Sequence, residues 1–166
     1  MKKFIEISIR LQQLYLFEDD NSGAPQLLRQ YVISTAANGP GEQKGSYKTP
    51  CGHHVIADKI GAGVPLFTVF HARQPTGEIW NPQLGAAHPK RDWILSRIMW
   101  LDGCEPGKNQ GGEVDTHARY IYIHGTSDEH LLGTPASHGC IRMGNADVTD
   151  LFELVEEGTP VNITAS

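Results

Sequence analysis

Apolar and polar side chains alternate at the start of the chain. Ile5, Ile7, Ile9 and Leu11 occupy every second position of residues 5–12, with polar or charged side chains between them. A period of two places successive side chains on opposite faces of an extended chain, which is typical of a β-strand with one buried face. The alternation therefore predicts a strand at residues 5–12.

Later segments are rich in branched and aromatic residues and are separated by turn-forming residues, which is typical of short strands. Acidic and small residues at 18–23 predict a turn between the second and third strands. The regular spacing favours a β-sandwich or a β-barrel. The further predicted strands lie at residues 14–17, 27–35, 54–60, 66–70, 93–101, 119–124 and 159–163.

One segment has the apolar spacing of a helix, with intervals of three and four residues that place the apolar side chains on one face. We expect Asn145 or Asp147 to cap the start of this helix and Gly158 to end it. The predicted apolar face comprises Val148, Leu151, Phe152 and Val155.

Two long segments, residues 73–92 and 102–118, contain many glycine and proline residues and show no periodicity. Long irregular segments within a compact domain often have a functional role. We expect both segments to border a functional site.

Composition limits the fold class and the partners. The length of 166 residues is typical of one domain, so we interpret residues 1–166 as a single domain. The formal net charge is −5, which excludes a nucleic-acid partner because phosphate binding needs clustered Lys and Arg. The longest uncharged apolar stretch falls well short of the roughly 18 residues that a membrane span needs.

The first residues bear on the cellular compartment. Residues 2–5 are basic and then apolar, as in a secretory signal, but Glu6 and Arg10 interrupt the apolar stretch and no small-residue cleavage site follows. We expect a cytoplasmic protein that begins at Met1, with a periplasmic location by an unrecognised signal as the alternative. In a reducing compartment the three cysteines stay thiols, so at least one is free to act as a nucleophile.

The candidate chemistry lies near the end of the chain. One strand end, a loop and a return would bring His124 beside Cys140, and His138 lies two positions before the cysteine. A nearby imidazole favours the thiolate, which is the nucleophilic form of cysteine. Gly139 leaves the amides of Gly139 and Cys140 free to approach a substrate oxygen, as an oxyanion hole requires. The spacing alone leaves open which histidine is the base.

Two other interpretations fit the same residues. A cysteine beside a histidine is often only part of the core, because free cysteine is among the most buried residue types. A zinc site is the second alternative, although no CxxC or HExxH motif is present, and we predict no metal and no cofactor. The zinc ligands would be His124, His138 and Cys140, with Cys51, His53 or His54 as the fourth.

Two motifs carry the site, His124-Gly125-Thr126 and Ser137-His138-Gly139-Cys140-Ile141-Arg142. Together they resemble the active-site signature of the L,D-transpeptidase catalytic domain (YkuD-like) family. Thr49-Pro50-Cys51-Gly52 looks like the Thr-Pro-x-Gly turn of that family, and residues 13–35 resemble its opening hairpin. The resemblance covers about residues 13–163.

The resemblance implies a mainly β fold, a β-sandwich with one helix after Cys140, and a cysteine enzyme that acts on peptidoglycan stem peptides. In the family the thiolate attacks the carbonyl of meso-diaminopimelate in a tetrapeptide stem and releases the terminal D-alanine. The resemblance makes Cys140 the nucleophile and His124 the base, with the Gly125 carbonyl orienting the other ring nitrogen. The implied oxyanion hole and pocket comprise His138, Gly139, the Cys140 amide, Ser137 and Arg142.

Arg142 lies two residues after Cys140, so its side chain points to the same side if the strand continues. Its planar guanidinium suits a substrate carboxylate. The alternative is a surface arginine paired with a nearby aspartate.

The acyl acceptor separates two activities within the family: an amine in transpeptidases and water in L,D-carboxypeptidases. The expected cytoplasmic location favours an L,D-carboxypeptidase that trims tetrapeptides to tripeptides in muropeptide recycling. The alternatives are an exported L,D-transpeptidase that cross-links or modifies peptidoglycan, and a non-catalytic muropeptide-binding domain. A carbapenem that acylates Cys140 would distinguish an enzyme from the binding domain.

The remaining cysteines, tryptophans and histidines have structural interpretations. His53 and His54 replace an apolar residue expected after the Thr-Pro-x-Gly turn, and residues 102–118 form a long segment, which bears on acceptor binding. We interpret Cys51 and Cys104 as structural thiols, Trp80, Trp93 and Trp100 as core or interface aromatics, and His71, His88, His117 and His130 as surface residues.

Overall fold

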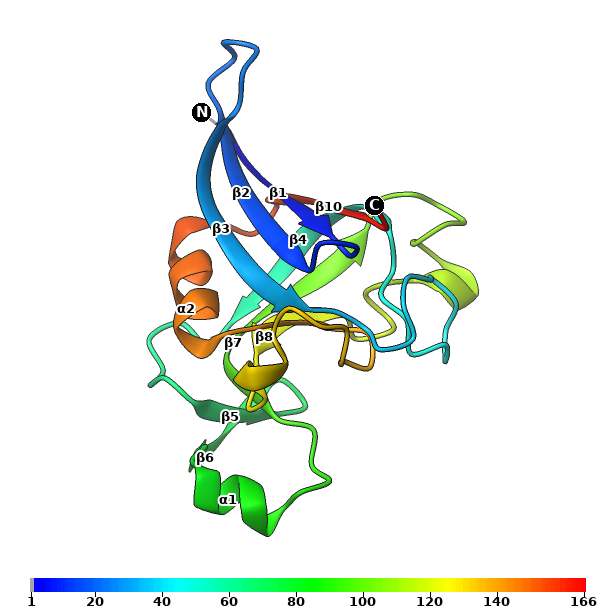
Figure 1. Ribbon diagram of the computed structural model, residues 1–166. Coiled ribbons are helices and arrows are strands. Elements are labelled where there is room, and N and C mark those ends of the chain that lie inside the picture. The colour runs from blue at the N-terminus through cyan, green and yellow to red at the C-terminus, as the bar shows by residue number, and fades with distance from the viewer. Residues whose placement is uncertain (1) are drawn as a thin grey trace.

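The computed structural model describes residues 2–166, which form one sheet of ten strands with two α-helices (Figure 1). The strands are β1 (Lys2–Ser8), β2 (Gln13–Asp19), β3 (Gln26–Ser34), β4 (Gly52–Ile60), β5 (Thr68–His71), β6 (Gln74–Ile79), β7 (Ile94–Gly103), β8 (Tyr122–Gly125), β9 (Ile141–Met143) and β10 (Pro160–Thr164). The helices are α1 (Pro82–Ala87) and α2 (Asn145–Leu154), with short 3-10 turns at Gly112–Val114 and Glu129–Leu131.

Eight of the strands close into a barrel. The order in the sheet is β4-β10-β1-β2-β3-β9-β8-β7-β5-β6, and β4 pairs with β7 as well as with β10. The expected β-sandwich is therefore wrong, while the mainly β class is confirmed. Alternating side chains mark one buried face in a sandwich and in a barrel alike, so the alternation could not distinguish the two.

Two pairings in the barrel are parallel and position the rest of the fold. β1 pairs with β10 in parallel, and β8 pairs with β9 in parallel, while the other pairings are antiparallel. The predicted hairpin of residues 13–35 is confirmed as β2 and β3. β1 ends at Ser8 rather than at residue 12, because Gln12 adopts φ 53° and turns the chain.

The barrel interior and the space between the sheet and α2 form one apolar core. α2 packs against β7 and β8 and buries Val148, Leu151 and Phe152 there (Figure 1). The largest fully buried side chains are Ile5, Ile7, Leu14, Leu16, Ile33, Ile56, Leu95, Ile98, Met99, Leu101, Ile123 and Ile141. Within residues 2–166, neither helix is long and apolar enough to cross a membrane.

The predicted helix after Cys140 is confirmed as α2 and begins at Asn145, where the sequence predicted its start, but the predicted cap and the predicted end are wrong. Gly144 is the residue before the helix, and it makes no side-chain capping hydrogen bond. The Asn145 side chain is buried and bonded elsewhere, so it cannot cap the helix. The helix ends at Leu154, and Gly158 lies in the following turn with φ 92°.

Residues 73–92, predicted to be irregular, contain β6 and α1. The helix is short and buries no residue, so it has no apolar periodicity to detect. Its start nevertheless has a recognisable signal, since the Asn81 side chain accepts a hydrogen bond from Leu84 N at 2.8 Å and Pro82 is the first helical residue. β5, β6 and α1 extend from the barrel at the bottom of Figure 1.

Candidate active site

The parallel pairing of β8 and β9 brings the two motifs together. His124 and Arg142 are register partners, and Cys140 directly precedes β9. Side chains two positions apart share a face, so Cys140 lies beside Arg142 on one strand and Tyr122 beside His124 on the other. All four line one cavity of about 300 Å³.

The Cys140 thiol is half-buried and bonded to backbone on both sides. Tyr122 N–H donates to Sγ at 3.3 Å, and the thiol donates to the Tyr120 carbonyl at 3.4 Å. Burial raises the pKa of Cys140 to about 12, against the opposing effects of the Tyr122 N–H and of two guanidiniums, Arg142 and Arg119. The thiol is therefore neutral in neutral solution.

His124 is only 2% exposed, and its ring orientation is defined by one hydrogen bond. Nδ1 lies 2.7 Å from the Gly125 carbonyl oxygen, which can only accept, so Nδ1 carries the hydrogen and Nε2 keeps its lone pair. Burial lowers the pKa of His124, while the Asp92 carboxylate and the Gly125 carbonyl oppose this effect. The ring is a neutral imidazole with Nε2 able to take a proton.

Residues 137–140 form a tight turn held by three hydrogen bonds. Ser137 Oγ donates to the Cys140 carbonyl at 2.6 Å and accepts from Gly139 N at 3.2 Å. Thr49 Oγ1, from the Thr-Pro-x-Gly turn, donates to the Gly139 carbonyl at 2.9 Å. The expectation that the Gly139 amide is free is therefore wrong for this structure, because that amide is bonded to Ser137.

The turn needs glycine at position 139. Gly139 has φ 134°, a conformation that L side chains rarely adopt. A Cβ there would lie 3.2 Å from Ile121 Cδ1 and 3.3 Å from the Lys48 carbonyl oxygen. A side chain at this position would therefore strain the backbone and require Ile121 or the segment before Thr49 to shift.

His138 is exposed at the rim of the Cys140 cavity. Its ring packs edge-on against Tyr47, with centroids 6.1 Å apart. Both rings also line a second cavity of about 550 Å³ on the other side of the turn. His138 and Ser137 line both spaces, so His138 stands between them.

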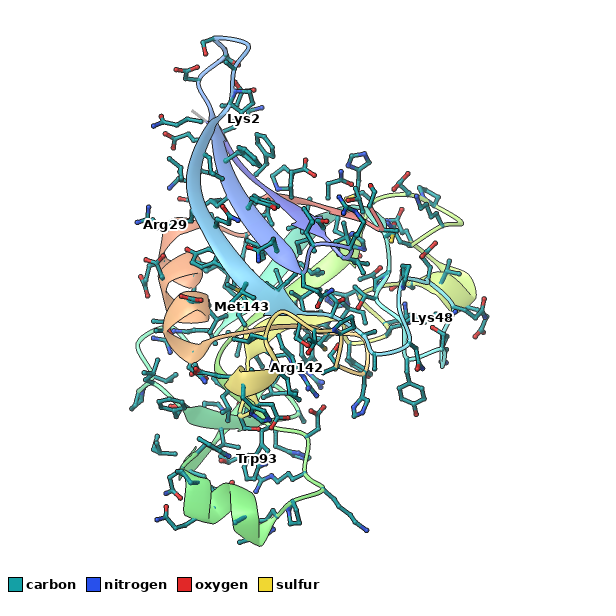
Figure 2. The ribbon with its side chains drawn as sticks, viewed as in Figure 1. Lys2, Arg29, Lys48, Trp93, Arg142 and Met143 are labelled. Carbon is teal, nitrogen blue, oxygen red and sulfur yellow. The ribbon has the colours of Figure 1, made fainter. Side chains whose placement is uncertain are left out.

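Arg142 is 8% exposed, with a guanidinium that contacts two carboxylates. Nη2 lies 3.4 Å from Asp92 Oδ1, and Nη1 lies 3.8 Å from Asp128 Oδ2. Arg142 lines the cavity on the same side as Cys140, as the sequence predicted. The alternative of a surface arginine is wrong, although the pairing with an aspartate that it included is present. Figure 2 shows Arg142 between the barrel and the extension that carries Trp93.

Several residues that line the cavity were missed by sequence reasoning. Residues 73–92 border the cavity as expected, through Arg73 and Asp92 at their two ends. Residues 102–118 do not, because they pack against β4, where Cys104 N donates to the His53 carbonyl. Alternation before His124 was a usable signal, since it places Tyr120 and Tyr122 on the same side as the histidine.

The zinc interpretation needs a fourth ligand near Cys140. His54 instead contacts the Gly52 carbonyl at 3.0 Å and the Thr116 hydroxyl at 2.9 Å, and Cys51 and His53 do not line the cavity. Among residues 2–166 no three His, Cys, Asp or Glu side chains gather as a metal-binding group.

The other predicted roles are confirmed in part. Cys51 and Cys104 are free thiols, and Trp93 is buried. His71, His88 and His130 are exposed, as predicted. His117 is not a free surface residue, because its half-buried ring stacks on Trp100 at 3.9 Å and contacts Asp58 at 3.2 Å.

The fold and the site define a class: a β-barrel domain with a cysteine and a neutral histidine in one cavity, next to a paired arginine. The chain belongs to the L,D-transpeptidase catalytic domain (YkuD) family, whose model matches residues 2–163.

Individual relatives are more distant or match over shorter lengths. The YkuD protein of Bacillus licheniformis is 50% identical over 42 residues, which are 25% of this chain and 26% of that protein. An L,D-transpeptidase from Mycobacterium smegmatis has a similar structure, with a TM-score of 0.56, 16% identity, and coverage of 99% of this chain and 59% of that one. An L,D-transpeptidase in complex with imipenem has a TM-score of 0.54 at 16% identity, covering 98% of this chain and 58% of that one.

The structural likenesses concern the fold alone. The chain spans about a quarter of the length of the Bacillus relative and somewhat more than half of the two solved structures.

Proposed function

We propose that this protein is an L,D-carboxypeptidase that releases the terminal D-alanine from peptidoglycan tetrapeptide stems. The observation that carries the proposal is the placement of the Cys140 thiol and the His124 imidazole in one cavity, with Nδ1 bound to the Gly125 carbonyl. Membership of the L,D-transpeptidase family supplies the substrate class.

The proposed first step is acylation of Cys140. Nε2 of His124 takes the thiol proton as sulfur attacks the carbonyl carbon of meso-diaminopimelate. The tetrahedral intermediate collapses, the bond to D-alanine breaks, and the leaving amine takes the proton from His124. A thioester remains on Cys140.

The second step returns the enzyme to its starting state. Water attacks the thioester carbonyl while His124 Nε2 takes a proton from it, and the proton then passes to the departing sulfur. The products are a neutral thiol and a tripeptide stem with a new carboxylic acid, which loses its proton to solvent. If an amine took the place of water, the same steps would form a cross-link.

The charges around the cavity suit the proposed substrate. Meso-diaminopimelate carries a carboxylate and an ammonium group on its side chain. Arg142 and Arg73 provide positive charge, and Asp92 provides negative charge. Asp92 is the more accessible partner in the ion pair with Arg142, with a side chain 53% exposed against 10%. We assign the substrate carboxylate to Arg142 and the ammonium to Asp92.

The cytoplasmic location also belongs to this proposal. β1 contributes the buried side chains of Ile5 and Ile7 and lies between β2 and β10 in the wall of the barrel. Residues 2–8 are thus part of the folded domain. In the cytoplasm the acyl-enzyme meets soluble stem peptides and about 55 M water, which favours hydrolysis over cross-linking and suits muropeptide recycling.

The decisive experiment incubates the purified protein with a free tetrapeptide stem and follows the products by mass spectrometry. We expect D-alanine and tripeptide to form faster than cross-linked dimers. Cys140→Ala should abolish release and keep the fold, while Cys51→Ala and Cys104→Ala serve as matched controls that remain active.

Three outcomes would contradict parts of the proposal. Full turnover in Cys140→Ala would exclude the cysteine mechanism. Dimer formation that outpaces hydrolysis would favour a transpeptidase. Binding of the stem without turnover, and without a covalent adduct on Cys140 from a carbapenem such as imipenem, would favour a muropeptide-binding domain.

A further inference from the structure

Arg119 lines the same cavity as Cys140, and its guanidinium is bonded to one segment of the chain. Nη1 donates to the carbonyls of Gly41 and Glu42 at 3.4 and 3.2 Å. Nη2 donates to Ser46 Oγ at 3.4 Å and to the Lys48 carbonyl at 2.7 Å. Residues 41–48 are therefore held to the turn that leads into β8.

None of these four acceptors carries a charge. Within residues 2–166 no carboxylate forms an ion pair with the Arg119 guanidinium; the Glu42 carboxylate is near enough to raise the pKa of Arg119, but burial is the larger effect and lowers it. Arg142, the other guanidinium near the thiol, is paired with Asp92 and Asp128. Arg119 is thus the less neutralised of these two positive charges.

The held segment borders the turn that carries the thiol. The Lys48 carbonyl approaches Gly139, Thr49 is bonded to the Gly139 carbonyl, and the Tyr47 ring packs against His138. The residue after Arg119 supplies the carbonyl to which the Cys140 thiol donates. One side chain therefore contacts the segment beside the turn and also brings charge to the cavity.

We propose that Arg119 is a positioning residue that holds residues 41–48 against the Cys140 turn and places an unpaired positive charge beside the thiol. This charge favours the thiolate and the negatively charged tetrahedral intermediate. The proposal rests on the proposed function only in taking Cys140 as the nucleophile.

The other charged and titratable groups around the thiol are known from the structure. β8 contributes His124 and Tyr122, and β9 contributes Arg142. Asp92, Arg73, Tyr120 and His138 come from the adjoining segments. Asp92 opposes the thiolate, and Arg142 and Arg119 favour it. Removing Arg119 should therefore take away one of the two guanidiniums that oppose the effect of Asp92.

The test measures the rate of Cys140 alkylation by iodoacetamide against pH, with the modified peptide identified by mass. Arg119→Gln should lower the rate at neutral pH by about three- to tenfold, which corresponds to an upward shift of roughly half to one pKa unit. Arg119→Lys keeps the charge and should restore most of the rate. Arg29→Gln is the matched control, because Arg29 pairs with Asp150 on the surface.

A second pair of variants separates the charge from the contact. Ser46 Oγ lies 3.4 Å from Nη2, so Ser46→Asp keeps a partner for the guanidinium while neutralising it. We expect slower alkylation in Ser46→Asp and no change in Ser46→Asn. A purely structural Arg119 would give unchanged or faster alkylation in Ser46→Asp, and this result would overturn the proposal even if Arg119→Gln failed to fold.

The alkylation assay needs no peptide substrate. A shifted pH profile without D-alanine release would support the role of Arg119 and contradict the proposed function. An unshifted profile in folded Arg119→Gln, together with D-alanine release by the wild type, would contradict the role of Arg119 and support the proposed function.

Discussion

A thiol and an imidazole in one cavity can rest as a neutral pair or as an ion pair. Here burial raises the pKa of Cys140 and lowers that of His124, and both shifts favour the neutral forms. The charges must then form as the substrate is attacked, with His124 as the proton acceptor. Reactivity should consequently rise with pH, because the thiolate fraction rises.

The two histidines should differ in their effect on that pH profile. His124→Gln removes the internal proton acceptor, so the apparent pKa of the thiol should shift upward and acylation should slow by roughly 10²- to 10⁴-fold. His138→Gln should shift the pKa less, since His138 is exposed at the rim. Alkylation rate against pH measures both variants, and the opposite order would assign the base role to His138.

Replacing Asp92 should make the Cys140 thiol more reactive and weaken substrate binding. Its carboxylate raises the pKa of Cys140, so Asp92→Asn should lower that pKa and speed alkylation at neutral pH by about two- to tenfold. The same change removes the proposed partner of the substrate ammonium, so KM for the tetrapeptide should rise. Asp19→Asn, in the distant β2 strand, is the control. Slower alkylation in Asp92→Asn would contradict this assignment of charge.

At the scale of single residues the sequence predicted the site in part. The motifs singled out Cys140, His124 and Arg142, and the structure brings these three residues into one cavity. Asp92 and Arg119 could not be assigned in this way, since neither belongs to the motifs and their contacts with Arg142 and Lys48 join segments far apart in the chain.

The start of α2 ties three elements together through one side chain. Asn145, 1% exposed, accepts from Ser96 Oγ at 2.7 Å and donates to the Thr126 carbonyl at 2.8 Å and to Glu129 at 3.0 Å. These contacts join β7 and the segment after β8 to the helix. Gly125 is required there as well, because a Cβ at that position would collide with Asn145 Oδ1 and the Leu95 carbonyl.

Removing this side chain should destabilise the domain. Asn145→Ala leaves the Thr126 carbonyl and the Ser96 hydroxyl without this partner in a buried site, and the free energy of unfolding should fall by roughly 2 to 4 kcal/mol. Urea denaturation followed by circular dichroism measures the loss. Asn38→Ala removes an exposed hydrogen bond and should cost much less. An equal fall in the free energy of unfolding in the two variants would show that the Asn145 side chain does not join these elements.

Strands and helices could be predicted from the sequence where their apolar side chains recur at a regular spacing. The strands and α2 have periodic apolar side chains, and most were located to within a few residues. α1 has no buried face, and its only signal is the local pair Asn81 and Pro82. The prediction that Asn145 caps the helix was wrong because its side-chain amide is hydrogen-bonded to Ser96, Thr126 and Glu129 instead.

The whole barrel depends on β1. Ile5 and Ile7 are fully buried or nearly so, and the strand bonds to neighbours on both sides. A chain lacking residues 2–8 should lose cooperative thermal unfolding as followed by circular dichroism, since two strand edges and the core would be exposed. A truncated chain that folds and alkylates like the full chain would show that the barrel does not need β1.

Closure of the barrel was beyond the reach of sequence patterns. It requires β4 to pair with β10 on one side and with β7 on the other, and these pairings join segments far apart in the chain. Local alternation says which face of a strand is buried and nothing about which strand lies next to it.

The parallel pair of β1 and β10 also affects how the protein can be made. β1 is the first strand to be synthesised, but Ile5 pairs with Val161, so its partner β10 is synthesised after all the other strands of the sheet. Until then β1 and β4 each present an unpaired edge to the cell, a state that other chains or chaperones can engage. The barrel can therefore close only after β10 has been synthesised, although its first strand is available from the start.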